Sequence, residues 1–257
     1  MMFLVALRSF VRYVPIKGVH ILNDGSVTAE DKALLFEHIP GLVFHELADF
    51  SSTACPAGGC WERLLGIATL VSDQYVIQLD SDTLAISAID EVVECVRNNT
   101  SFTLGTWDGQ KFETMAERAG QAKKLMSSMS NSHIQVLAEA NLDKLSGYES
   151  LRYIRGCAGF AGFAMRSFSR EKVEFLSQEM YTALGSKWNT WGSEQFASNV
   201  IVANSERAAV LPHPKYCSCN RVQPETSFIH FIGGCRFKHG IYARLGNRVI
   251  SELKRSV

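Results

Sequence analysis

Hydrophobic and polar positions alternate between helical and strand spacing along most of the chain. Apolar residues recur every three or four positions over residues 1–14, which predicts a helix that Pro15 ends. A short apolar run at 19–22 predicts a strand, and Thr28 is placed to cap a helix that extends to about Phe36. The opening of the chain is therefore predicted as helix, strand and helix.

The clearest strand signal follows a second amphipathic helix. Apolar residues at helical spacing predict this helix over 61–70, and residues 75–79 then form a short, nearly continuous apolar run. Such a run is typical of a strand that is buried on both faces. The acidic segment Asp80-Ser81-Asp82 comes next, and a helix is expected from about Ile86 to Arg97. The sequence thus places two carboxylates at the carboxyl end of a buried strand.

The same alternation continues to the end of the chain. Further strands are expected at 42–44, 157–164, near 210 and at 228–232, and further helices over much of 111–150, after Ser169, at 193–203 and from about Ile241. Alternating strands and helices predict an α/β fold with a mostly parallel central sheet and helices on both faces. No linker-like segment interrupts the pattern, so we expect a single domain over residues 1–257.

Composition and charge narrow the possible functions. The 257 residues are 46% hydrophobic and carry a formal net charge of zero, which gives no support for a nucleic-acid surface or a polybasic membrane stripe. No apolar run reaches the roughly 20 residues that a membrane span needs. Seven scattered cysteines predict free thiols and a cytoplasmic location. Cys217 and Cys219, near His213 and His239, lack the paired spacing of a structural zinc site.

The strongest chemical signal is the pair Asp80 and Asp82. Two carboxylates one residue apart at a strand end can point the same way and bind one hard cation. Ligands of open α/β sheets bind at the carboxyl ends of strands, where this pair is expected. The simpler interpretation is a polar loop in which Asp82 or Thr83 caps the next helix. Residues 156–163, another expected strand, offer only small side chains without a polar group.

Several segments resemble GT-A glycosyltransferases, in particular the glycogenin-like family (family 8), and they follow the family's order along most of the chain. Trp61-Glu62-Arg63-Leu64 with residues 75–83 is similar to the helix and strand that lead to this family's metal-binding aspartates. Residues 19–26 look like the family's second strand, and Asp24 stands where relatives contact the nucleoside. The resemblance implies a GT-A (nucleotide-diphospho-sugar transferase-like) fold.

The later part of the chain extends the resemblance. His230-Phe231-Ile232-Gly233 with Lys238 is similar to a family motif in which the histidine ligates the metal and the lysine contacts phosphate. Glu194-Gln195 resembles an acidic-glutamine pair that orients the donor sugar. The resemblance therefore implies metal ligands Asp80, Asp82 and His230, substrate contacts Asp24, Arg63, Asp80, Ser81 and Lys238, and catalytic residues Glu194 and Gln195. Oxygen and imidazole ligands favour Mn²⁺, with Mg²⁺ as the other choice.

Each of these residues also has a purely structural interpretation. His230 lies in an apolar strand, where a histidine is commonly a core residue. Glu194 is favoured at the start of any helix by the helix dipole, and Arg63 can be a solvated side chain of an amphipathic helix. Lys238 lies further from Gly233 than the family motif requires, so Arg236 competes with it as the phosphate contact.

The implied function is transfer of a sugar from a nucleoside diphosphate sugar, by default a UDP-sugar, to a glycan, a lipid-linked saccharide, a protein or a small molecule. The chain begins in the helix that follows the family's first strand, so this strand is expected to be missing. An inactive relative that only binds a sugar nucleotide is therefore an alternative. A haloacid-dehalogenase phosphatase would place its threonine four residues after the first aspartate, whereas Thr83 follows Asp80 by three. A nucleotidyltransferase would need a glycine-rich phosphate loop near its start.

Overall fold

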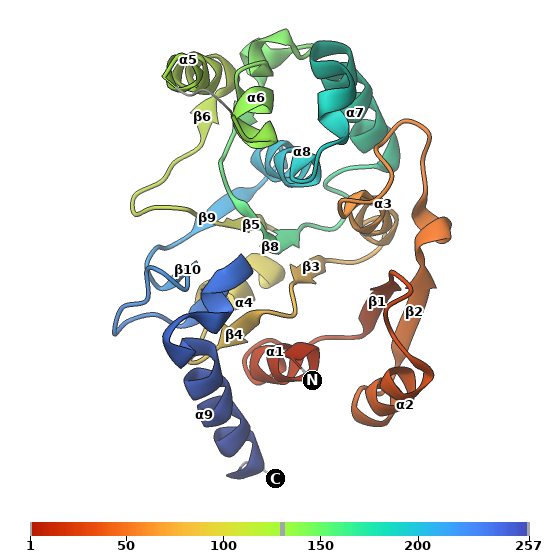
Figure 1. Ribbon diagram of the computed structural model, residues 1–257, viewed down its shortest axis with the longest axis vertical. Helices are drawn as coiled ribbons and strands as arrows, with labels where there is room; N and C mark the ends of the chain where they lie inside the picture. Colours follow the sequence, from red (N-terminus) through yellow and green to blue (C-terminus); the bar gives the residue numbers. More distant parts are fainter. Residues whose placement is uncertain (1, 129–131, 256–257) are drawn as a thin grey trace.

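The computed structural model describes residues 2–128 and 132–255, which form an α/β molecule (Figure 1). With η marking short 3-10 helices, the first half contains α1 (Met2–Val11), β1 (Val19–Asn23), α2 (Ala29–His38), β2 (Leu42–Glu46), η1 (Leu47–Phe50), α3 (Trp61–Leu70), β3 (Val76–Leu79), β4 (Thr83–Ala85), α4 (Asp90–Arg97), β5 (Ser101–Leu104), β6 (Glu113–Thr114) and α5 (Met115–Met126). The second half contains α6 (Ile134–Glu139), η2 (Leu142–Lys144), η3 (Tyr148–Ser150), β7 (Arg152–Tyr153), β8 (Cys157–Phe163), α7 (Arg170–Leu184), η4 (Gly185–Asn189), α8 (Ser193–Ala203), β9 (Ala208–Leu211), β10 (Tyr216–Ser218), β11 (Phe228–His230), η5 (Gly233–Gly240) and α9 (Ile241–Arg255).

The central sheet has the strand order β3-β8-β5-β9. Strand β8 runs against both β3 and β5, and β9 runs parallel to β5, so three of the four strands share one direction. Side chains of β8 alternate between two cores: Ala161 and Phe163 face helices α3, α7 and α8, whereas Phe160 packs with Phe10 of α1. The expected α/β class with helices on both faces is confirmed (Figure 1), but the central sheet is mixed, because β8 pairs antiparallel with both of its neighbours.

A second sheet has the strand order β10-β11-β4, and β11 is followed in the chain by η5 and the C-terminal helix α9. Strand β11 runs parallel to β10 and antiparallel to β4, which places His230 opposite Thr83. The helix expected over 86–97 begins only at Asp90, because the N–H groups of Ile86 and Ser87 donate to the Ser227 carbonyl and so extend the contact between β4 and the segment before β11. This pairing brings the residues after Asp80 next to a strand that lies almost 150 positions later in the chain.

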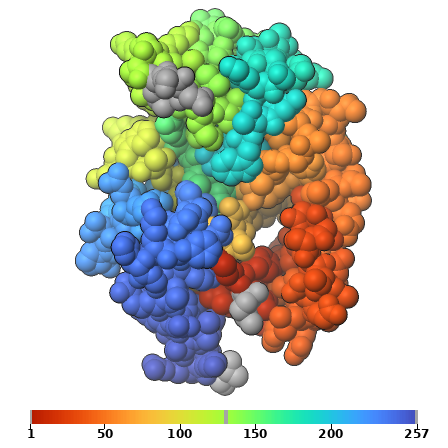
Figure 2. Space-filling model, in the orientation of Figure 1, coloured from red at the N-terminus to blue at the C-terminus, as the bar shows by residue number. Residues whose placement is uncertain are grey.

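The two N-terminal strands form a separate sheet. Strands β1 and β2 pair only with each other in parallel, and β1 is not hydrogen-bonded to β3. Thr28 caps α2 as predicted, since its side chain accepts a hydrogen bond from the Asp31 N–H. Within the described ranges, no strand precedes α1. Figure 2 shows the molecule hollowed between the lobe that holds β1, β2 and α2 and the remainder of the structure.

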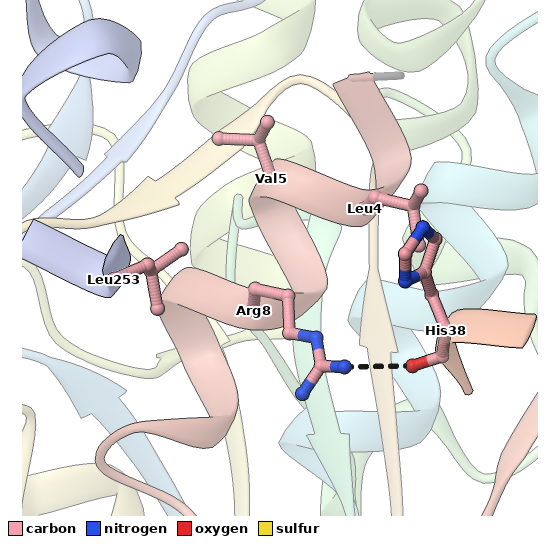
Figure 3. Close-up of a pocket in the computed structure, with 5 residues that line it drawn as sticks. All are labelled: Leu4, Val5, Arg8, His38 and Leu253. Atoms are coloured by element: carbon pink, nitrogen blue, oxygen red, sulfur yellow. Dashed lines mark hydrogen bonds between the residues drawn. The ribbon is translucent and has the colours of Figure 1, made fainter. Parts of the chain in front are cut away.

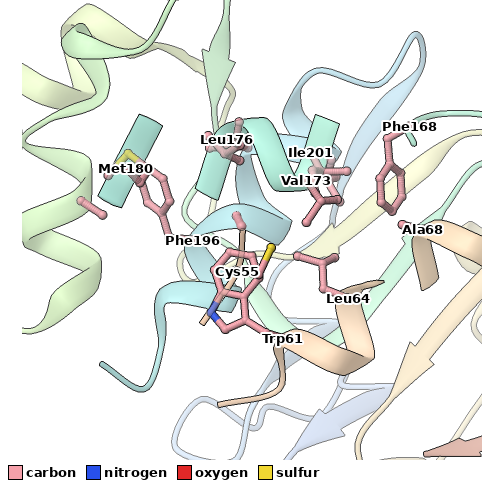
Figure 4. Packing of buried hydrophobic residues seen from close by; sticks show 14 of the residues in the cluster. Cys55, Trp61, Leu64, Ala68, Phe168, Val173, Leu176, Met180, Phe196 and Ile201 are labelled. Atoms are coloured by element: carbon pink, nitrogen blue, oxygen red, sulfur yellow. The ribbon is translucent and has the colours of Figure 1, made fainter. Parts of the chain in front are cut away.

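The largest core cluster anchors the start of α3. Trp61 is 1% exposed and packs with Leu64, Phe196 and Met180 between helices α3, α7 and α8 (Figure 4). Its indole Nε1 donates a hydrogen bond of 2.9 Å to the Ser193 hydroxyl, so the first residues of α3 and α8 are held together. Because Arg63 and Glu194 lie within these first turns, the core fixes the positions of two predicted site residues.

The cysteines differ from the sequence expectation. Cys219 and Cys235 are joined by a disulfide, so the expectation of free thiols is wrong for this pair. The spacing of the cysteines gave no indication of the pair, because 16 positions separate them and the fold of β10, β11 and η5 brings them together. Since disulfides persist in oxidising compartments, the cysteine pattern no longer supports a cytoplasmic location.

An apolar pocket lies between α1, the end of α2 and α9. It has a volume of about 190 Å³ and is lined by Leu4, Val5, Arg8, His38 and Leu253, with Arg8 donating to the His38 carbonyl at 2.8 Å (Figure 3). None of these residues belongs to the predicted site.

No helix in the described ranges combines the length and the apolar character that crossing a membrane requires.

Candidate functional site

Backbone contacts fix the loop that carries Asp80 and Asp82 on both sides. The Asp80 N–H donates to the Gly159 carbonyl of β8 at 2.9 Å, and the Thr83 hydroxyl donates to the Asp80 carbonyl at 2.8 Å. The Phe231 N–H donates to the Asp82 carbonyl at 2.8 Å. Strands β8 and β11 therefore hold the two aspartates, and the Thr83 hydroxyl bonds to the backbone instead of capping α4.

The structure brings Asp80, Asp82 and His230 together. One ligand atom from each residue lies within 4.8 Å of the other two, and no other group of three acidic, histidine or cysteine residues in the described ranges does so. His230 Nε2 is 3.2 Å from Asp82 Oδ1 and 3.7 Å from Asp80 Oδ2. His230 and Asp82 are buried, whereas the Asp80 side chain keeps 30% exposure. Two carboxylates and one imidazole with an opening to solvent can hold a divalent cation.

Positive groups surround the two carboxylates. Arg63 contacts Asp80 Oδ1 at 2.8 Å, and Arg236 contacts Asp82 Oδ2 at 3.2 Å. Burial opposes ionisation of Asp82, but the hydrogen bond and charge of His230, together with Arg236, hold the Asp82 pKa below its usual value. Burial likewise favours neutral His230, yet its hydrogen bonds to Asp82 and Cys157 and the nearby Asp80 charge raise its pKa to about 10. The oxygens that could ligate a metal are thus paired with cationic side chains.

Strand β8 shapes the other side of the histidine. Cys157 Sγ lies 3.2 Å from His230 Nδ1, so the two ring nitrogens face Cys157 and Asp82. Gly159 lies against the ring, and a Cβ at that position would be 2.5 Å from Nε2 and 2.6 Å from Nδ1. The prediction that residues 156–163 carry no polar side chain is wrong for Cys157. The register of β8 against β5 shifts before the Leu104–Cys157 pair, so simple alternation along the strand does not predict that both residues approach His230.

Glu194 and Gln195 lie at the start of α8, on the other side of Arg63. Glu194 Oε2 is 3.6 Å from Arg63, and Oε1 has no hydrogen-bond partner among the described residues. Burial, opposed in part by Arg63, raises the pKa of Glu194 to about 7. Gln195 accepts from the Ala158 N–H at 3.4 Å and donates to the Gln135 side chain at 3.0 Å. Glu194 therefore joins the cluster through Arg63, whereas Gln195 contacts the β8 backbone.

The remaining predicted residues lie apart from these contacts. Asp24 follows β1 in the separate two-stranded sheet, and hydrogen bonds from Ser26 lower its pKa. Ser81 is exposed between the two aspartates. Lys238 is exposed in a non-helical part of η5, and Arg236 supplies the ion pair to Asp82. The geometry thus favours the arginine over the lysine as the basic residue nearest the carboxylates.

Comparisons with known proteins yield only distant structural matches. The sequence matches no protein-family model and no curated protein. Among solved structures, the chain is similar to mouse xyloside xylosyltransferase 1 in its apo form, with a TM-score of 0.38 and 14% identity over 91% of this chain and 92% of that chain. This similarity is too low to transfer an activity or a ligand from that protein to this chain.

Proposed function

We propose that the chain is a metal-dependent glycosyltransferase that moves a sugar from a nucleoside diphosphate sugar, by default a UDP-sugar, to an acceptor. The observation that carries this proposal is the cluster of Asp80, Asp82 and His230 at a strand end, flanked by Arg63 and Arg236. The resemblance to glycogenin-like enzymes of family 8 agrees with the same residues. Mn²⁺ fits a mixed oxygen and imidazole ligand set, and Mg²⁺ is the second choice.

The charges of the cluster predict how its ligands bind. Each of the two carboxylates already has an arginine partner, so a cation that enters alone must compete with two guanidinium groups. A nucleoside diphosphate brings phosphate oxygens, which guanidinium groups bind in a planar, bidentate geometry. Arg63 and Arg236 can then pass from the aspartates to the phosphates while the carboxylates ligate the metal. We therefore expect the metal and the diphosphate to bind far more tightly together than separately.

The residues around the cluster would have different roles in the transfer of the sugar. As the bond between the anomeric carbon and the diphosphate breaks, negative charge grows on the leaving diphosphate, where Arg63 and Arg236 can stabilise it. A bound divalent cation would supply further stabilisation of that charge. Glu194 and Gln195 would orient the donor sugar, Ser81 would contact the phosphates once the donor is bound, and the exposed Lys238 would contribute to phosphate binding less than Arg236. Asp24 would contact the nucleoside.

The second candidate is an inactive relative that binds a sugar nucleotide without transferring sugar. The observation in its favour is the separation of β1, which leads to Asp24, from the central sheet that leads to Asp80. A donor whose nucleoside contacts Asp24 and whose diphosphate contacts Asp80 would have to span the space between the two sheets. In contrast, the haloacid-dehalogenase phosphatase has no support, because the Thr83 hydroxyl is bonded to the Asp80 carbonyl.

Donor hydrolysis separates the two candidates. The purified chain is incubated with Mn²⁺ and a panel of UDP-sugars, and released UDP is measured with and without a chelator. An active transferase is expected to release UDP slowly from at least one donor when the metal is present, and Asp82→Asn is expected to lose most of this activity. UDP binding without any metal-dependent release would support the inactive relative, and equal release by Asp82→Asn would refute the proposed site.

A further inference from the structure

Two aromatic side chains stand in solvent beside the carboxylate cluster. Among the described residues, Phe237 at 80% and Trp191 at 72% are the most exposed of the large hydrophobic side chains, and Phe175 of α7 follows at 55%. Trp191 precedes Glu194 by three residues, and Phe237 directly follows Arg236. Exposed apolar side chains scattered singly need no explanation, but here the two extreme cases both belong to segments that supply site residues.

The loop around Trp191 is held in a defined shape. The Ser193 N–H donates to the Thr190 carbonyl at 3.3 Å, which closes a turn around Trp191 and Gly192. Gly192 has a φ of +102°, and a Cβ there would lie 2.8 Å from the His133 ring. The His133 and Trp191 rings meet edge to face at 6.2 Å. The indole is therefore supported at one edge while most of its surface faces water.

The same loop is tied to the residues that contact Asp80. Ser193 receives the buried hydrogen bond from the Trp61 indole, and the Trp191 Cα lies 4.0 Å from the position of a Cβ on Gly59. Gly59 leads directly into α3, whose Arg63 contacts Asp80 and Glu194. Trp191 thus lies on the Arg63 side of the cluster.

Phe237 lies on the opposite side of the cluster. The Arg236 guanidinium is 5.4 Å from the centre of the Phe237 ring, and the same guanidinium contacts Asp82. The segments that carry the two aromatic residues also supply charged groups, since Glu194 pairs with Arg63, and Arg236 pairs with Asp82. A lipid chain or an apolar protein helix binds in a mainly apolar groove, so these charges favour a ligand with both polar and apolar surface.

We propose that Trp191 and Phe237 bind the acceptor, and that the acceptor is a saccharide with a pyranose ring stacked on the Trp191 indole. This inference rests on the proposed function. A pyranose has a face of C–H bonds, which can pack on an aromatic ring, and a rim of hydroxyls, which can bond to charged groups. Aromatic residues on both sides of a charged cluster match this alternation of apolar and polar surface.

Saturation-transfer NMR on the complete chain tests the inference directly, because it detects millimolar binding without turnover. The probes are the methyl β-glycosides of glucose, galactose, xylose and N-acetylglucosamine, each measured with the wild type and with Trp191→Ala, Trp191→Phe, Phe237→Ala and Phe175→Ala. We expect transfer to the ring C–H protons of at least one glycoside, with binding about tenfold weaker in Trp191→Ala and weaker in Phe237→Ala. Trp191→Phe should restore most of the signal, and Phe175→Ala should match the wild type.

The inference is overturned if no glycoside gives a signal with the wild type, or if Trp191→Ala binds as the wild type does. Its failure is distinguishable from failure of the proposed function, which is judged by Mn²⁺-dependent binding and release of UDP in the absence of any acceptor. A chain that binds Mn²⁺ and UDP but no glycoside would retain the proposed function and lose this acceptor site. A chain that binds a glycoside through Trp191 but no UDP would do the reverse.

Discussion

Replacing Gly159 by alanine should disable the site through a single methyl group. The added Cβ would lie 2.5 Å from His230 Nε2 and 2.6 Å from Nδ1, well inside van der Waals contact, so the imidazole must move. The ring is buried and is held by Asp82 and Cys157, which prevents it from swinging away freely. Overpacking of this kind costs about 1–3 kcal/mol, and loss of one or two polar contacts adds about 1 kcal/mol each. We therefore expect Gly159→Ala to lower the free energy of unfolding by about 2–5 kcal/mol.

The same substitution should weaken ligand binding more than a general loss of stability would. His230 is a proposed metal ligand, and changing a residue that orients a metal ligand typically costs 10–100-fold in metal affinity. Urea unfolding gives the stability, and calorimetric titration of Mn²⁺ in the presence of UDP gives the affinity. Gly120→Ala is the matched control: a Cβ at Gly120 in α5 meets open space, and the change should stabilise the helix by about 0.5–1 kcal/mol. A Gly159→Ala protein with wild-type stability and wild-type affinity would refute the proposed role of His230.

Substitutions at four further positions test the surroundings of the cluster. Cys157→Ala should weaken Mn²⁺ binding in the presence of UDP about tenfold, because it removes the partner of His230 Nδ1, whereas Cys157→Ser should retain most of the affinity. Equal Mn²⁺ affinities of Cys157→Ala and the wild type would exclude a role of Cys157 in orienting His230. Arg236→Gln should weaken UDP binding in titration calorimetry by about tenfold and Lys238→Gln by less than twofold, and the reverse order would favour the lysine. Glu194 has a folded pKa of about 7 against a usual 4.5, so the unfolded carboxyl ionises first and the wild type loses stability as pH rises through this window. In urea unfolding, Glu194→Gln should therefore gain up to about 3 kcal/mol relative to wild type between pH 4 and pH 8, and a pH-independent difference would contradict the shifted pKa.

Local patterns were sufficient to predict much of the fold. The helices at 61–70 and 193–203 have the predicted ends, because each is a largely apolar run that follows a glycine with a positive φ, at Gly59 and Gly192. The apolar run before Asp80 forms β3, one residue shorter than predicted. These elements depend on spacing within about ten residues, which the sequence displays directly.

Long-range pairing explains most of what the sequence did not reveal. Strand β5 was missed because it has only four residues, and it is stabilised by β8 and β9, which lie more than fifty positions later. Strand β4 was not predicted because its partner, β11, lies more than 140 positions later. The contacts of Cys157 and Arg236 with His230 and Asp82 also arise from this packing, so residue type alone could not predict them.

The most direct test of the central claim is thermal unfolding of the chain with Mn²⁺, with UDP, and with both together. A native-state ligand at 100 times its Kd stabilises a protein by about 2.7 kcal/mol, which corresponds to roughly 5–10 °C in a chain of this size. We expect a shift of this order only when both are present, and its loss in Asp80→Ala. No shift with both present, or the same shift in Asp80→Ala, would contradict a metal and diphosphate site at Asp80, Asp82 and His230.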